Sequence, residues 1–374
     1  MTFGSLMTWA IIVVSPTIAL AADLPSEADL LAKAKQIHSR IITFDSHLDL
    51  PFDYAGAATD GKTQFDLPKS ARGQLKGAAI AVFVPQGPRT PEGYAKARVD
   101  AEKKLAIIKA VAGENSDRAA VAYSPADVRR ISAQGKFALV ISMLNVYPLG
   151  SEIAQLDEWY KRGVRILGYT HAGNNDWADS SRPSKALNDK PGEHGGLSEL
   201  GKQGVARLND LGMLIDVSQL TTPGLKQVLA LTRAPVAATH SGIKAIVDAP
   251  RNLSDEELDL IKKNGGVVQV VAFSNYLRKA PESSEGGAPP APATVAQLVE
   301  SISYAVKKIG VDHVGISSDF NHGGGVLGWQ NEGEAQNVTI ELLRRGFSER
   351  DIAKLWGGNF LRVWAQAQLA GTRN

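Results

Sequence analysis

The chain has 374 residues, 44% hydrophobic and 21% charged, a balance that excludes intrinsic disorder and suffices for a large buried core. Its net charge of +2 offers no basic footprint for nucleic acid. The absence of cysteine excludes disulfides, thiolate metal sites, iron–sulfur clusters and cysteine nucleophiles. Any metal must therefore be bound by His, Asp, Glu or similar oxygen ligands.

The first residues of the chain predict an export signal. An apolar run from Met7 to Val14 precedes the small-residue pattern Ala19-Leu20-Ala21, which is typical of a signal-peptidase site. No Lys or Arg precedes the run, so a frayed apolar tail is the alternative. The run is too short to span a bilayer, and no later stretch approaches that length. We expect a signal peptide at 1–21 and a soluble domain at 22–374, located in a bacterial periplasm or secreted.

From Ile41 onward, short β-rich apolar runs alternate with stretches of helical period. The expected strands are 41–47, 78–84, 137–143, 164–171, 213–219, 235–241, 267–274 and 313–320. The expected helices are 94–111, 152–162, 197–211, 223–231, 255–263, 295–309, 337–345 and 349–368. This alternation predicts an α/β fold, a single-domain (β/α)8 TIM barrel with C-terminal helices. The alternative, an open doubly wound sheet, lacks a glycine-rich phosphate loop after its first strand.

Polar residues gather where the expected strands end, which is where TIM barrels carry their active sites. His47 and Asp49 flank one residue, so on an extended strand both side chains leave the same face and are placed to bind one cation. His240 and Asp319 end later strands. We expect these four residues to bind a metal; the alternative is a buried, hydrogen-bonded polar cluster. Asp319 is also a candidate general base.

Two further residues are candidates for binding substrate. His171 opens the polar loop HAGNNDWADSS and is placed to stabilise an oxyanion or orient the substrate, or simply to cap its strand. Arg251 follows the sixth strand and presents a planar fork suited to a carboxylate, unless it pairs with Asp248 or Asp255. The Pro- and Gly-rich segment 279–294 is expected to form a surface loop or a mobile edge of the active-site mouth.

Several stretches, in order along the chain, resemble the membrane (renal-type) dipeptidases, amidohydrolase-like metallopeptidases of peptidase family M19. They are DSHLDLP (45–51), YTHAGNNDWADS (169–180), HGGLSELG (194–201), LNDLGMLIDVSQ (208–219), the segment 233–258 and VGISSDF (314–320).

The resemblance implies two zinc ions, a dipeptide as small-molecule substrate, in some members with a C-terminal D-residue, and a homodimer. By position, it implies that His47 and Asp49 bind the first metal and His240 the second. It further implies that His171 stabilises the tetrahedral intermediate, that Asp319 shuttles the proton, and that Arg251 and Tyr276 bind the substrate carboxylate.

The sequence departs from the family pattern at two metal ligands. Leu144 stands where the family has the glutamate that bridges both metals, and Gln219 stands where it has a histidine. Leucine cannot coordinate a metal, and a glutamine amide is a weak substitute for imidazole at zinc. One zinc ion is therefore expected rather than two.

Three functions are compatible with these residues. The first is an exported, metal-dependent dipeptidase that uses a metal-activated water. The second is a divergent amidohydrolase that acts on another small amide or ester. The third is a catalytically impaired homologue that binds dipeptides without hydrolysing them.

Overall fold

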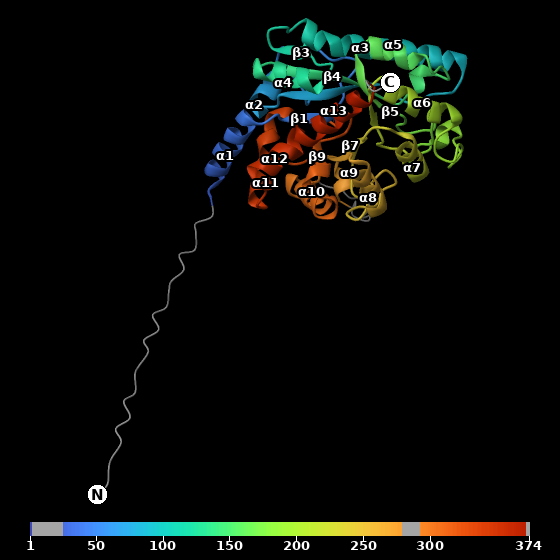
Figure 1. Ribbon diagram of the computed structural model, residues 1–374. Coiled ribbons are helices and arrows are strands. Elements are labelled where there is room, and N and C mark those ends of the chain that lie inside the picture. Colours follow the sequence, from blue (N-terminus) through green and yellow to red (C-terminus); the bar gives the residue numbers. More distant parts are fainter. Residues whose placement is uncertain (2–24, 279–291, 372–374) are drawn as a thin grey trace, which may run out of the picture.

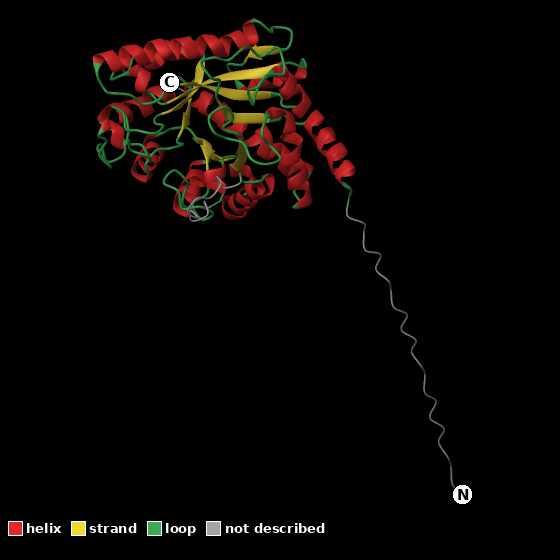
Figure 2. Ribbon diagram, turned by 180° about the vertical axis from the view of Figure 1, so that it is seen from behind, coloured by secondary structure: helices red, strands yellow, loops and turns green. Residues whose placement is uncertain are grey.

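The computed structural model describes Met1 and residues 25–278 and 292–371, which form a nine-stranded parallel sheet surrounded by helices (Figures 1 and 2). The expected signal peptide and most of the 279–294 segment lie outside the described residues. No helix in the part of the chain described here combines the length and apolar character needed to cross a membrane.

Eight strands follow one another around the sheet in chain order. They are β1 Phe44–Leu48, β2 Gly77–Phe83, β4 Phe137–Leu144, β5 Val164–Gly168, β6 Leu214–Asp216, β7 Ala237–Ser241, β8 Val267–Val271 and β9 Val314–Ser317. The last strand returns to the first, because the Asp319 N–H donates to the His47 carbonyl and the Asp49 N–H to the Phe320 carbonyl, both at 3.0 Å. These contacts confirm the predicted TIM barrel.

The helices lie outside the strands (Figure 2). They are α1 Glu27–Arg40, α2 Leu67–Gly73, α3 Pro91–Gly113, α4 Pro125–Ala133, α5 Gln155–Lys161, α6 Glu199–Asp210, α7 Thr222–Leu231, α8 Asp255–Asn264, α9 Ser274–Leu277, α10 Val295–Ile309, α11 Ala335–Arg344, α12 Glu349–Ala353 and α13 Asn359–Gly371. Local signals set many of the boundaries: α10 starts at a capping box on Thr294 and ends at Gly310.

The predicted helices are all present, but the sequence pattern missed several elements. Helices α1, α2, α4 and α9 and the strand β3 (Ala119–Val121), which pairs with β4, were not expected. The expected helix 349–368 is divided into α12 and α13 by a π-helical turn at Lys354–Gly358. Helix α1 is held by tertiary packing, because Leu30 and Ala34 bury against Ile340 of α11, its neighbour in Figure 1.

Helix α13 packs against the strands in a second apolar cluster. Residues from the beginnings of the strands, including Phe44 and Val267, bury against Phe360 and Trp364 of α13. The rings of Phe44 and Phe360 stack with centroids 5.2 Å apart. This apolar packing lies near the amino-terminal ends of the strands and leaves the polar residues for the carboxyl ends.

Candidate functional site

The carboxyl-terminal ends of the strands form the mouth of the barrel. Three residues there have strained backbone. Asn145, Gln219 and Asp319 follow β4, β6 and β9 and have φ angles of 73°, 66° and 56°. Residues other than glycine seldom adopt this left-handed conformation, and where they do they concentrate at functional sites. The strain therefore points to the same end of the barrel as the candidate residues do.

His47 and His240 face each other at the centre of the mouth. Their rings stack with centroids 3.9 Å apart and an interplanar angle of 10°. The Nε2 atom of His47 lies 3.7 Å from Oδ1 of Asp319, and that oxygen is buried without a hydrogen-bond partner. The structure thus brings together three of the four residues predicted to bind metal.

Asp49, the fourth, is paired with a lysine. The Nζ atom of Lys104, on α3, lies 2.9 Å from Oδ1 of Asp49 and also donates to the Leu50 carbonyl. The two side chains are only 5% and 4% exposed. On the other side, Nδ1 of His322 lies 3.5 Å from Oδ2 of Asp49. Asp49 is thus the anionic half of a buried ion pair.

Gln219 holds His240 by its side-chain amide. Its Nε2 atom is 2.9 Å from Nε2 of His240, while its Oε1 accepts from Nη2 of Arg182 at 2.5 Å. On the other side of the ring, Nδ1 of His240 lies 2.8 Å from Oγ1 of Thr239, which donates to Asp216 at 2.6 Å. Both nitrogens of the His240 ring therefore have partners within the protein.

The predicted carboxylate-binding pair is adjacent. The Arg251 guanidinium lies over the Tyr276 ring, 4.7 Å from its centroid, and donates to the His240 carbonyl. Arg251 is 4% exposed, whereas Asp248 lies 3.5 Å from Lys244 and Asp255 accepts from Tyr304. The alternative of an ion pair with Asp248 or Asp255 is therefore wrong.

Arg182 adds a second guanidinium that the sequence reasoning missed. It lies 3.5 Å from the Tyr276 hydroxyl and 3.3 Å from Nε2 of His171. The Nε atoms of Arg182 and Arg251 are both buried without a partner. Two neighbouring guanidinium groups, one buried and one half-buried, each with an unused donor, form a candidate site for an anion.

Burial sets the protonation of the site. It lowers the pKa of His47 to about 3 and that of His171 to about 2, with Arg182 adding to the effect on His171, and it lowers the pKa of His240 well below 6.5. It raises the pKa of Asp319 to about 7, against the opposing charge of Arg251. At neutral pH the imidazoles are uncharged, while Asp319 populates both of its forms.

These residues do not fit a catalytic zinc ion. A metal lies in the plane of the imidazole that binds it, so one ion cannot serve the parallel rings of His47 and His240. The position of the bridging carboxylate is apolar, because Leu144 packs with Ala81 and Phe83. Within residues 25–278 and 292–371, no group of three or more His, Asp or Glu side chains is arranged to hold a metal.

Sequence patterns gave little sign of Lys104 and Arg182. Lys104 lies within a long helix, where lysine is normally solvated, and Arg182 lies in an irregular loop. A second Arg next to the HAGNNDWADSS loop was the one available signal for Arg182.

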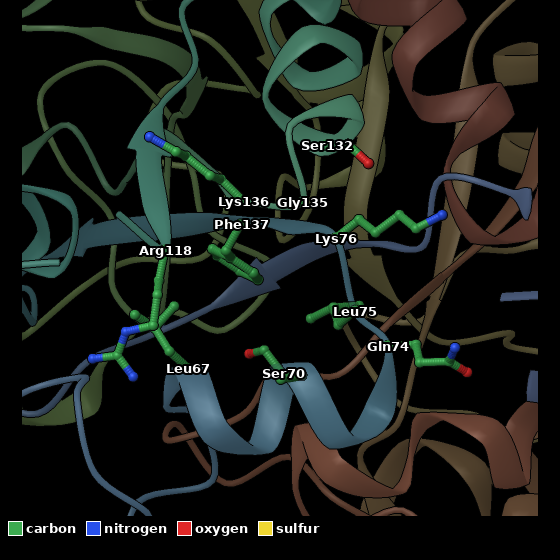
Figure 3. A pocket seen from close by; sticks show the side chains of 11 residues that line it. Leu67, Ser70, Gln74, Leu75, Lys76, Arg118, Ser132, Gly135, Lys136 and Phe137 are labelled. Atoms are coloured by element: carbon green, nitrogen blue, oxygen red, sulfur yellow. The ribbon is translucent and has the colours of Figure 1, made fainter. Parts of the chain in front are cut away.

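A different pocket, about 290 Å³ in volume, lies near the amino-terminal ends of the strands (Figure 3). Its basic residues Lys76, Arg118 and Lys136 point away from one another (Figure 3). Each donates to a backbone carbonyl. Without convergent polar groups, this pocket is a poor candidate for the functional site.

Several known proteins are similar to this chain in sequence or in fold. "Dipeptidase verJ" of Clonostachys rogersoniana is 29% identical over 90% of this chain and 86% of its own length. The crystal structure of the probable dipeptidase PvdM from Pseudomonas aeruginosa is 45% identical, has a TM-score of 0.88, and covers 92% of this chain and 100% of that chain. A metallopeptidase from Rhodobacter sphaeroides, 21% identical over 87% of this chain and 99% of its own, shares the fold with a TM-score of 0.75.

The sequence profile of the family "Membrane dipeptidase (Peptidase family M19)" matches residues 31–374. These similarities confirm the resemblance read from the motifs and place the chain among the dipeptidase-type hydrolases. The chain belongs to the membrane dipeptidase family, peptidase family M19.

Proposed function

We propose that the protein hydrolyses dipeptides and related small amides that carry a free carboxylate. The observation that carries the proposal is the pair of guanidinium groups of Arg182 and Arg251, whose Nε atoms are buried without a partner, beside the unpartnered oxygen of Asp319. An anionic end group bound by the two arginines places the neighbouring amide close to that carboxyl. The relatives named as dipeptidases support the same substrate class.

Asp319 is the proton-transfer group in this proposal. In its ionised form it accepts a proton from the attacking water, and in its protonated form it returns the proton to the leaving amine. A pKa of about 7 makes both forms accessible near neutral pH. The uncharged His171, whose Nε2 faces Arg182, keeps its proton on Nδ1 and is the candidate donor to the developing oxyanion.

The test is a panel of L,L- and L,D-dipeptides incubated with the purified mature chain, with added zinc and with chelator. We expect turnover of free dipeptides and at least tenfold weaker binding of C-terminally amidated ones, because the carboxylate carries the charge that the arginines bind. Asp319→Asn should lower kcat by about 100-fold or more while leaving KM nearly unchanged. Asp248→Asn, at a carboxylate 80% exposed, is the matched control. Equal turnover of amidated and free dipeptides would contradict the proposal.

Dipeptide binding without turnover is the second candidate. It is favoured by the contact between Gln219 and Nε2 of His240, a residue that the resemblance assigns to a metal. Calorimetry that shows dipeptide binding, together with no turnover under any condition in the panel, would select this candidate.

Three finer features are also part of the proposal. Export rests on the apolar run Met7–Val14, and N-terminal sequencing of protein from a periplasmic fraction should begin near residue 22. A preference for a C-terminal D-residue is tested by the L,D arm of the panel. A homodimer is tested by light scattering. Dependence on zinc is tested by the incubations with chelator, because the side chains present at the site do not fit the ion.

A further inference from the structure

We infer that this barrel works without a metal ion, because Lys104 pairs with the Asp49 carboxylate and the Gln219 amide occupies the Nε2 atom of His240. This inference holds whether the pocket hydrolyses its ligand or only binds it. It assigns to Lys104 and Arg182 the role of internal cations in place of bound ones.

A buried positive charge prevents a metal ion from binding to Asp49. The Lys104 ammonium lies 2.9 Å from Oδ1 of Asp49, and the Leu50 carbonyl accepts from the same nitrogen. The Phe52 ring lies against it, with its centroid 4.6 Å from Nζ. A divalent ion on this carboxylate would have to displace a buried ammonium or share a site with it, and like charges so close together repel strongly in a buried site.

A directed chain of hydrogen bonds prevents a metal ion from binding to His240. Arg182 has only donors, so the Gln219 group it contacts must be the amide oxygen, which turns the Gln219 NH2 toward His240. The NH2 donates to Nε2 of His240, so the ring proton is on Nδ1 and points to Thr239. The lone pair that a metal would need is therefore already accepting a hydrogen bond, and Arg182 behind it adds repulsion toward a cation.

The apolar side chains at the ends of two neighbouring strands are also unsuited to a cation. Leu144 and Phe83 are 2% and 5% exposed and pack together at the ends of β4 and β2. The Phe83 ring lies 4.5 Å from the rings of both His171 and His322. An apolar surface here gives a bridging water or ion no oxygen ligand.

The test measures bound metal rather than activity. Mature protein is dialysed against zinc and then against metal-free buffer, and its zinc content is measured by plasma mass spectrometry, with thermal unfolding recorded with and without zinc. We expect far less than one zinc per chain and no zinc-dependent rise in Tm. About one zinc per chain that is lost in His47→Ala or in His240→Ala would overturn the inference. Zinc that persists in both variants is bound elsewhere and does not contradict it.

Restoring the missing metal ligands provides the converse test. The triple variant Leu144→Glu, Gln219→His, Lys104→Met supplies the two missing ligands and removes the internal cation. We expect it to bind zinc at least tenfold more tightly than the wild type and to rise in Tm when zinc is added. The matched control Leu144→Gln, Gln219→Asn, Lys104→Met introduces polar side chains of similar size without strong ligands and should show neither effect. If the triple variant fails to fold, the zinc content of the wild type still decides the question.

Discussion

Replacing Lys104 by methionine should destabilise the fold by leaving Asp49 buried without its counter-charge. Both side chains are nearly inaccessible, at 5% and 4% exposure, and their charged atoms are 2.9 Å apart. Methionine keeps most of the side-chain volume, so loss of the ion pair dominates over creation of a cavity. Removing one member of a buried pair costs about 3–5 kcal/mol.

The expected Tm shift follows from chain length. Roughly 350 residues at about 2.1 cal/mol/K each give an unfolding entropy near 0.7 kcal/mol/K, so this loss corresponds to a Tm lower by about 4–7 °C. The exposed neighbour Lys103, whose Nζ lies 5.4 Å from the Phe52 ring centroid, provides the matched control. Lys103→Met should change the free energy of unfolding by less than about 0.5 kcal/mol.

A double-mutant cycle isolates the pair. Urea unfolding is measured for the wild type, Lys104→Met, Asp49→Asn and the double variant, in which neither charge remains. Asn keeps an oxygen for the Leu50 N–H, which donates to Oδ1 of Asp49 at 2.7 Å. We expect the double variant to recover at least about 2 kcal/mol of the summed single losses. If the losses in the free energy of unfolding of the two single variants simply add in the double variant, the view that this lysine neutralises the carboxylate is refuted. A loss below about 1 kcal/mol for Lys104→Met would refute it as well.

Two further predictions concern residues away from the mouth. Burial lowers the pKa of His38 to about 4, so the folded state binds fewer protons than the unfolded state between pH 4 and 6.5, and stability falls as the pH falls through that range. His38 should account for about 2 kcal/mol of the loss between pH 7 and 5, and His38→Gln should flatten the urea-unfolding profile by that amount; an unchanged slope would contradict this. A Cβ on Gly201 would lie 2.1 Å from the Trp177 carbonyl oxygen, whereas one on Gly113 would meet nothing within 4 Å. Gly201→Ala should therefore destabilise by about 1–3 kcal/mol and Gly113→Ala should not, and equal thermal midpoints would argue against it.

The barrel could be predicted from the sequence because its strands are continuous apolar runs and its helices carry local start and stop signals. The expected helix 295–309 matches α10 at both ends, where the Thr294 cap and Gly310 act locally. The missed strand β3 has only three residues, too few for a period to show. The missed helix α4 did carry a signal, since Ser124 caps it and Pro125 begins it.

The site was predictable in its strand-end residues and, through the resemblance, in Arg251 and Tyr276. His47, His171, His240 and Asp319 could be found because barrels concentrate chemistry at strand ends. Their contacts could not, because the partners lie far apart along the chain. Lys104, for example, is 55 residues from the carboxylate it pairs with. A lysine within a helix normally points to water, and only the packing of α3 against β2 turns this one inward.

Leu144 and Gln219 explain why the internal cations are needed. The Asp49 carboxylate at the barrel mouth must be neutralised, whether by a metal or by a side chain, because an unpaired buried charge is costly. Apolar packing at the other end of the strands, where α13 covers Phe44, lies away from this carboxylate and cannot neutralise it. Once the bridging position is a leucine, a lysine on Asp49 supplies the missing positive charge without any ion. Arg182 then fixes the Gln219 amide on His240 and leaves an unused donor for an anionic ligand.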